Sequence, residues 1–397
     1  MDRAQLIALA HGTGCAEARG QFVFLCDPKW GINERATLDR LFNEADALGA
    51  SSADSGWLCL PTGGTTGGLR FARHDERTLG AAVQGFCAHF GIERVDTIGV
   101  LPPFHVSGLM ARVRSAATGG VYRDWSWKRL EAGERPKVTN TNTVLSLVPT
   151  QLERLLKDEA CIAWLRQLRI IFLGGGPIWP ELAQAAARAE LAISLTYGMT
   201  ETAAMITGLR PSEFAAGRRS SGAALSHAEI EIVDPESGQL LPNGEIGLVR
   251  IRGESLFLGY FPASRKTAWF STEDLGFLDA YGQLNLLGRR DAVIITGGKK
   301  VAPLEVENAL RASGEFSDVA VIGLPDSSWG EIVVAAHPVQ PVAPDSEKVE
   351  AALATLPPFK RPKRLVPLAY WPRNEQGKVN RAALRAAIGS TDSNPIR

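Results

Sequence analysis

The chain has 397 residues, of which 45% are hydrophobic, and its 43 basic residues are balanced by 43 acidic ones. A chain of this length buries a large core and is expected to form two or more domains, and the balanced charge excludes a basic nucleic-acid-binding face or an acidic tail. No apolar run approaches the ~20 residues of a membrane span, and the first residues, Met-Asp-Arg-Ala-Gln, lack the pattern of a secretory signal.

Short apolar runs, each followed at once by proline, glycine or polar residues, recur in the first two-thirds of the chain. Such runs are typical of buried strands. We expect four of them, at Ile98–Leu101, Val144–Val148, Ile170–Leu173 and Ile193–Leu195. Helical patterns lie between the runs, one over residues 79–90 and one that opens at Pro149. The alternation predicts a layered α/β domain, whose ligands usually lie beyond the carboxyl ends of the strands.

From about residue 225 the pattern changes. Residues 229–233 and 246–251 alternate as half-buried strands do, which indicates a small β-rich subdomain. A further unit follows Asp291, with a helix at Pro303–Ala312 and strands near 319–322 and 332–335. We therefore expect three parts: α/β layers over 1–224, a β-rich subdomain over 225–290, and an α+β C-terminal domain over 291–397.

Cysteine usage indicates the compartment. Five scattered cysteines, an odd number, form no Cys-x-x-Cys pair. This pattern is typical of buried thiols in a reducing cytosol and argues against structural zinc. We therefore expect a cytoplasmic protein.

A glycine- and hydroxyl-rich segment, Thr62–Gly68, is the first candidate for ligand binding. Glycines let backbone N–H groups turn toward an anion, and threonine hydroxyls add donors. The segment predicts either a phosphate-binding loop or a flexible loop without a ligand. It is not a P-loop of the Walker type, because no Gly-Lys-Ser/Thr follows at the required spacing.

A second candidate is Tyr197-Gly-Met-Thr-Glu201, which offers an aromatic ring, a hydroxyl and a carboxylate within five residues. Adenine stacking on Tyr197, a phosphate accepting from Thr200 and Mg²⁺ at Glu201 would use all three. A buried tyrosine beside a capping threonine is the alternative interpretation.

Three further residues are ambiguous when each is taken alone. Asp274, which follows the strand-like 269–272, is expected either to accept from both ribose hydroxyls or to cap a turn. Arg289 is a second ribose contact or a solvated arginine, and His105 is a catalyst or a packed histidine. Lys378, in the polar segment 372–381, would by itself be assigned to a surface turn.

Together with Gly288–Asp291, these segments resemble, in order and spacing, the adenylate-forming superfamily of acyl-CoA ligases, adenylation domains and luciferases, over about residues 58–385. The resemblance implies a large N-terminal domain, a small mobile C-terminal domain, and ATP, Mg²⁺ and coenzyme A as ligands. The residues that it assigns to the nucleotide and phosphates are Thr62, Gly63, Gly64, Thr65, Thr66, Gly67, Arg70, Gly175, Gly176, Pro177, Tyr197, Gly198, Thr200, Asp274 and Arg289. It assigns Mg²⁺ to Glu201 and the hinge to Asp291.

The resemblance makes Lys378 catalytic, bridging carboxylate and α-phosphate oxygens during adenylation. A mobile cation there would stabilise the charge that develops when two anions react. In the second half-reaction, a swing of the C-terminal domain about Asp291 would remove Lys378. The same swing would bring in Gly297, Gly298 and Lys299, whose glycines leave room for a thin pantetheine arm.

The chain departs from the superfamily pattern in two places. Leu69-Arg70 replaces the usual Pro-Lys, and Gly63 stands where serine or threonine is usual. The phosphate segment also lies nearer the start of the chain than in typical members. We therefore expect a shortened N-terminal region, whose exposed face a partner subunit, such as a second copy of the chain, would cover.

The acid is indicated by Phe104–Arg114 and Leu147–Leu152, which resemble segments of o-succinylbenzoate–CoA ligases of menaquinone biosynthesis. His105, Ser107 and Arg114 would then contact the substrate, with the forked donors of Arg114 pairing with its second carboxylate. Alternatively, Arg114 belongs to a helix surface and the enzyme takes another aromatic or aliphatic acid. A nucleotide-binding relative without catalysis is a third possibility, against which the joint presence of Lys378, Glu201 and Asp274 argues.

Overall fold

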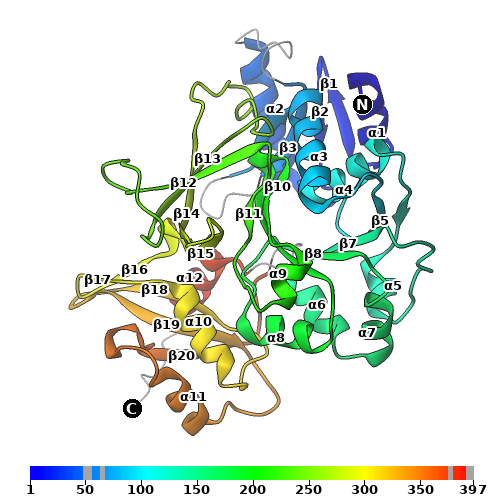
Figure 1. The fold of residues 1–397 in the computed structure, drawn as a ribbon. Helices are drawn as coiled ribbons and strands as arrows, with labels where there is room; N and C mark the ends of the chain where they lie inside the picture. Colours follow the sequence, from blue (N-terminus) through cyan, green and yellow to red (C-terminus); the bar gives the residue numbers. More distant parts are fainter. Residues whose placement is uncertain (48–55, 63–67, 374–378, 390–397) are drawn as a thin grey trace.

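The computed structural model describes residues 1–47, 56–62, 68–373 and 379–389, and this part of the chain forms four β-sheets with helices packed around them (Figure 1). No helix among these residues is long and apolar enough to cross a membrane. All five cysteines are free thiols, three of them buried and two half-buried.

The first sheet is four-stranded, in the order β1-β2-β3-β4, and its strands span Ala16–Arg19, Phe22–Leu25, Leu58–Thr62 and Arg70–His74. Helices α1 (Arg3–His11) and α2 (Ile32–Ala47) accompany it. Phe24 packs edge-on against both Phe71 and Phe261, with ring centroids 5.0 Å apart in each pair. Phe261 belongs to the segment that follows the later strand β13 (Gly247–Gly253), so this aromatic cluster joins the first sheet to the β-rich region.

The second sheet is seven-stranded, in the order β11-β10-β9-β8-β7-β5-β6, and its β6, β5, β7, β8 and β9 run parallel. Its strands are β5 (Asp96–Gly99), β6 (Tyr122–Asp124), β7 (Thr143–Leu147), β8 (Ile170–Leu173), β9 (Ile193–Met199), β10 (Ala204–Gly208) and β11 (Ala223–Ala224). The helices between them are α3 (Glu76–Phe90), α4 (Val106–Ala117), α5 (Trp127–Glu131), α6 (Pro149–Leu155), α7 (Glu159–Leu165), α8 (Pro180–Arg188) and α9 (Pro211–Ala215). The predicted α/β fold class is confirmed. β9 is longer than expected, so Tyr197 lies within this strand and not after it.

The third sheet is antiparallel, with strands β12 (Ala228–Val233), β13 (Gly247–Gly253), β14 (Phe270–Leu278) and β15 (Leu284–Arg289) in that order. These four strands match the predicted β-rich character. Asp274 was expected to follow a strand at 269–272, but it lies in the middle of β14, because this strand continues through Leu278.

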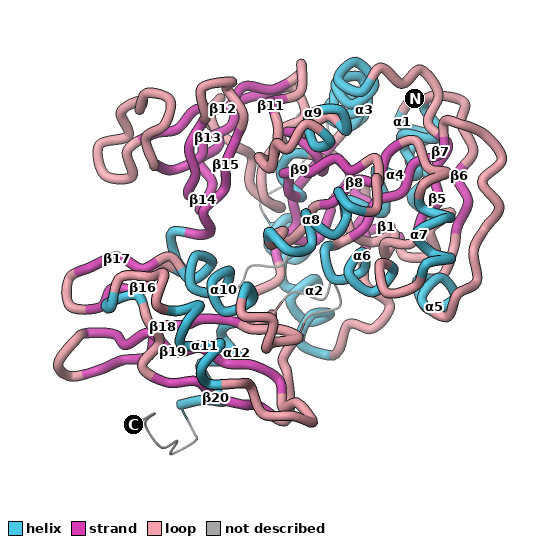
Figure 2. The backbone as a smooth tube through the Cα atoms, turned by 60° about the horizontal axis from the view of Figure 1, so that its bottom comes forward, coloured by secondary structure: helices cyan, strands magenta, loops and turns pink. Residues whose placement is uncertain are grey.

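The last sheet begins after a short 3₁₀ turn, η2 (Arg290–Ala292), that contains Asp291. Its strands are β16 (Ile294–Thr296), β17 (Lys299–Val301), β18 (Ala320–Asp326), β19 (Gly330–Pro338) and β20 (Arg364–Leu368), and its helices are α10 (Pro303–Ala312), α11 (Ser346–Leu353), η3 (Pro358–Lys360) and α12 (Arg381–Gly389). Figure 2 shows these elements gathered into one group beside the second and third sheets. They bury two apolar clusters of their own, around Val306 and Val321 and around Ile322 and Leu384.

Candidate functional site

Tyr197 and Asp274 meet where the second and third sheets face each other. Tyr197 is only 8% exposed, and its hydroxyl donates a 2.6 Å hydrogen bond to Asp274 Oδ2. Burial, reinforced by the negative charge of Asp274, raises the pKa of Tyr197, so its hydroxyl stays protonated and donates. Asp274 also lies directly opposite Arg289 in the pairing of β14 with β15. The structure thus brings together three residues predicted to bind adenosine.

Arg289 also contacts the predicted hinge. Its Nε and Nη2 donate to the two carboxylate oxygens of Asp291 at 2.9 and 2.8 Å. This forked pair raises the pKa of Arg289 and lowers that of Asp291. A predicted ribose ligand and the predicted hinge are therefore joined by two hydrogen bonds.

Thr200 and Glu201 form a short 3₁₀ turn, η1 (Thr200–Thr202), directly after β9. Glu201 is 6% exposed, and its Oε1 accepts hydrogen bonds from Tyr260 (2.6 Å) and from Thr62 (3.3 Å). The carbonyl of Thr200 lies 2.8 Å from His74 Nε2. Burial lowers the pKa of His74 to about 4, so the ring is neutral near pH 7 and that nitrogen can donate to the carbonyl.

Tyr260 and His74 were missed in the sequence. His74 ends β4, and Tyr260 pairs with Ala72 of the same strand. The contacts of Tyr260 with Glu201 and of His74 with Thr200 join residues 59 and 126 positions apart, which no local pattern reveals. The only signal in the sequence for a role of residue 260 is that it is a tyrosine, a residue type that can bury its ring while its hydroxyl forms a hydrogen bond.

The segment predicted to hold phosphates begins and ends on paired strands, because Thr62 of β3 lies opposite Arg70 of β4. The guanidinium of Arg70 stacks over the ring of Tyr260 at 4.3 Å. The two ends of the segment are thus placed beside Glu201. The rest of the predicted phosphate ligands, Gly63, Gly64, Thr65, Thr66 and Gly67, lie outside the described residues.

The glycines predicted to bind the nucleotide lie in two places. Gly175 and Gly176 follow β8, and Gly198 lies within β9. Gly175 has a φ of +77°, which favours glycine, and Gly176 and Pro177 continue the loop. At Gly198 a Cβ atom would lie 1.9 Å from the carbonyl oxygen of Ala204, so only glycine fits. Close approach of backbone to backbone therefore shapes this edge of the site.

The residues predicted to contact the acid lie along α4 but not together. His105 is its N-cap residue, with its ring 4.5 Å from that of Phe104, and Ser107 is in the first turn. Arg114 lies nine residues beyond His105, about 13 Å along the helix axis. Its guanidinium is buried and stacks over Phe86 at 4.3 Å, and burial lowers its pKa to about 10.

The glycines predicted to admit the pantetheine arm, Gly297 and Gly298, form the turn between β16 and β17 and have φ values of +54° and +73°. Gly297 donates a 2.9 Å hydrogen bond to the carbonyl of Trp329, whose ring packs against it. The ammonium of Lys299 lies 4.5 Å from the centre of the Phe359 ring.

Lys378 lies outside the described residues, but the residues that flank its segment are held by buried carboxylates. Arg373 pairs with Val379 as an isolated bridge. Asp318 accepts from Trp371 Nε1 at 2.7 Å and pairs with Arg373, and Glu307 accepts from Arg381 at 2.6 Å. The described residues on both sides of residues 374–378 are therefore tied to the C-terminal elements.

The described residues contain no group of three or more His, Cys, Asp or Glu side chains suited to a metal ion. Mg²⁺ is often held by one or two carboxylates together with substrate phosphates and water. A single buried carboxylate, Glu201, beside the segment predicted to bind phosphates fits that mode.

Comparisons with known proteins agree with this geometry. Residues 26–261 match the AMP-binding enzyme family, and residues 305–378 match the AMP-binding enzyme C-terminal domain. A curated 2-succinylbenzoate–CoA ligase from Enterococcus faecalis is 31% identical over 329 residues, which cover 80% of this chain and 67% of that protein.

Two solved structures of o-succinylbenzoate CoA synthetase from Bacillus subtilis are also similar, each at 29% identity. The complex with the acyl-adenylate intermediate gives a TM-score of 0.72, covering 87% of this chain and 70% of that one. The complex with ATP and magnesium ion gives 0.73, covering 84% and 70%.

Proposed function

The chain belongs to the AMP-binding enzyme family, and we propose that it joins o-succinylbenzoate to coenzyme A through an acyl-adenylate, with ATP as the second substrate. The observation that carries the proposal is the constellation around Glu201. Thr62, Tyr260 and the Thr200–Glu201 turn meet there, and the Tyr197–Asp274 hydrogen bond comes from the same strand, β9. The printed names of the relatives support the acid and the thiol acceptor.

We propose a division of labour among the chain's own residues. Tyr197, Asp274 and Arg289 would hold the adenosine, and Arg70 and Thr200 would orient the phosphates. Mg²⁺ held at Glu201 would neutralise charge on the phosphate oxygens. Lys378 would supply positive charge where the carboxylate attacks, which lowers the barrier because that charge is needed most in the transition state.

We propose that the second half-reaction uses a different segment of the C-terminal domain from the one that carries Lys378. Residues 291–397 would rotate on Asp291 relative to 1–290, replacing Lys378 by the Gly297–Lys299 turn. The exposed turn and its two positive φ values support this role, since they leave backbone without side chains at the place where a narrow arm would pass. We place the reaction in the cytoplasm, where the five free thiols would stay reduced.

One observation favours a second candidate. Arg114, expected to bind the second carboxylate of o-succinylbenzoate, stacks on Phe86 about 13 Å along α4 from His105. Leu109, which is near the start of the same helix, is apolar and only 1% exposed. An aromatic or aliphatic acid with one carboxylate is therefore the second candidate substrate.

Exchange of labelled pyrophosphate into ATP, measured with a panel of acids, tests both candidates. We expect exchange with o-succinylbenzoate, followed by formation of its CoA thioester when CoA is added. Exchange with monocarboxylates alone would establish the second candidate. A protein that binds ATP but supports exchange with no acid would instead be a nucleotide-binding relative without catalysis.

A further inference from the structure

Tyr260 occupies a fixed place between the two charged groups that the proposed function assigns to ATP. Its backbone pairs with Ala72 of β4, and on either side of it Leu258 donates to the carbonyl of Arg73 and Phe261 to that of Phe71, each at 2.8 Å. The segment thus runs as an added strand along β4. This pairing sets where the Tyr260 ring and hydroxyl point.

The hydroxyl of Tyr260 points at the proposed metal ligand. It lies 2.6 Å from Glu201 Oε1, which Thr62 also approaches at 3.3 Å. In this hydrogen bond the tyrosine is the donor and the carboxylate the acceptor. Among the described residues, none hydrogen-bonds to Oε2. The described contacts therefore hold the carboxylate through one oxygen, Oε1.

The ring of Tyr260 contacts a positively charged group, Arg70. The guanidinium of Arg70 lies 4.3 Å from the ring centre, within the range of a cation–π interaction. Phe257 packs against the same ring, with centroids 4.8 Å apart at 60°. Because an arginine stacked on a ring keeps its donors in one plane, this contact limits where Arg70 can present them.

We propose that Tyr260 is a positioning residue for the magnesium–ATP complex, its hydroxyl orienting Glu201 toward the metal and its ring orienting Arg70 toward the phosphates. The proposal rests on the proposed function, because it presumes that the chain binds ATP with Mg²⁺. It adds that the two orientations depend on different atoms of one side chain. They can therefore be removed one at a time.

The test measures ATP binding by isothermal titration calorimetry, once with Mg²⁺ and once with EDTA. Tyr260→Phe keeps the ring and removes the hydroxyl. We expect it to weaken magnesium–ATP binding about tenfold, the usual effect of losing a hydrogen bond to a charged group, and to leave ATP binding in EDTA unchanged. Tyr260→Leu removes the ring as well and should weaken binding in both conditions.

The chain provides a matched control in Tyr281, which is 71% exposed and is also stacked by an arginine, Arg218, at 3.7 Å. Tyr281→Phe and Tyr281→Leu should leave ATP binding unchanged in both conditions. In pyrophosphate exchange, Tyr260→Phe should raise the Mg²⁺ concentration needed for half-maximal rate while the KM of the acid stays constant. A loss of general packing would move both.

The outcomes are distinct. If the wild-type chain fails to bind ATP, the proposed function fails and Tyr260 loses its role with it. If the wild type binds magnesium–ATP and Tyr260→Phe binds it equally well, or weakens binding to the same extent with and without Mg²⁺, the positioning role is wrong. The ligand-induced rise in melting temperature, taken for each variant against its own ligand-free value, gives the same comparison even if a variant is less stable.

Discussion

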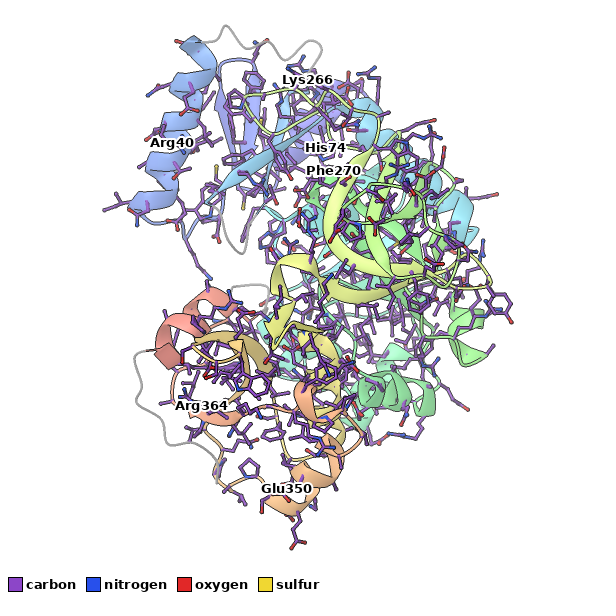
Figure 3. The ribbon with its side chains drawn as sticks, turned by 90° about the vertical axis from the view of Figure 1, so that its left-hand side faces the viewer. Arg40, His74, Lys266, Phe270, Glu350 and Arg364 are labelled. Atoms are coloured by element: carbon purple, nitrogen blue, oxygen red, sulfur yellow. The ribbon has the colours of Figure 1, made fainter. Side chains whose placement is uncertain are left out.

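The nucleotide side of the site and the last sheet hold their predicted functional residues in opposite ways. On the nucleotide side, Tyr197 and Glu201 are almost fully buried and hydrogen-bonded to residues of other elements. In the last sheet, Gly298 and Lys299 are exposed on a turn. Figure 3 shows this separation, with His74 and Phe270 in one part of the molecule and Arg364 and Glu350 in the other.

This difference in burial is consistent with different proposed functions for the two groups of residues. Groups fixed before the ligand arrives need little reorganisation when charge develops, which suits a side that binds the nucleotide throughout the reaction. A unit with its own apolar clusters keeps its fold when it moves, which suits groups needed in one half-reaction only. Arg311 of α10, which stacks on Trp179 ahead of α8 at 4.6 Å, is one contact between the two sides.

The largest expected effect comes from removing the charge proposed to move. Lys378→Ala should slow adenylation at least about a thousandfold, equivalent to about 4 kcal/mol, because that charge acts mainly in the transition state. ATP binding and the thioester step from preformed acyl-adenylate should be much less affected. Single-turnover measurement of each half-reaction checks this.

Lys299→Ala is the matched control, since the proposed function gives Lys299 a role in the thioester step and predicts the reverse pattern. Equal loss of both half-reactions in Lys378→Ala would remove the division of labour between the two sides.

The sequence correctly predicted the elements that are determined by residues close together in the chain. The α10 helix has the expected bounds, Pro303–Ala312, because a proline at its first turn and the apolar spacing of Val306 and Leu310 lie within ten residues. The α/β layers follow from apolar runs in the same way. The first sheet was not predicted, since Phe22–Leu25 joins it by pairing with β3, more than thirty residues away across α2.

The site was predicted to the extent that its motifs are contiguous in the chain. Tyr197–Glu201 is one segment, and its residue types suggested nucleotide-binding roles, although they equally fitted a buried tyrosine beside a capping threonine. Tyr260 and His74 reach Glu201 and Thr200 only through tertiary pairing with β4. Arg114 shows what helix spacing could not predict. The spacing gave its distance from His105 along the helix, but it did not reveal that the guanidinium of Arg114 stacks on Phe86.

A second prediction concerns the rigidity of the nucleotide side. His74 is fully buried, and its pKa of about 4 lies below the 6.5 of an exposed histidine. As the pH falls, the unfolded chain therefore takes up this proton first, so stability present above pH 6.5 is lost on the way to pH 4. The loss should be about 3 kcal/mol.

Denaturant unfolding from pH 7.5 to pH 4 measures this loss. His74→Gln should be less stable at pH 7.5 but show a pH dependence smaller by that amount. Amide protection factors near Thr200, corrected for the intrinsic pH dependence of exchange, should fall on acidification before those of β18 and β19. Coinciding pH profiles for the variant and the wild type would mean that His74 does not hold the Thr200 turn as described.

The smallest expected effect concerns the joint between the two sides. Asp291→Pro fixes φ at the proposed hinge and should slow thioester formation about a hundredfold, or about 2.7 kcal/mol, while adenylation changes only severalfold. The same substitution also breaks the forked pair with Arg289. Asp291→Asn separates these causes, because it weakens the pair without restricting the backbone. If Asn slows the thioester step as much as Pro, the ion pair and not rotation at residue 291 controls the exchange of Lys378 for the Gly297–Lys299 turn.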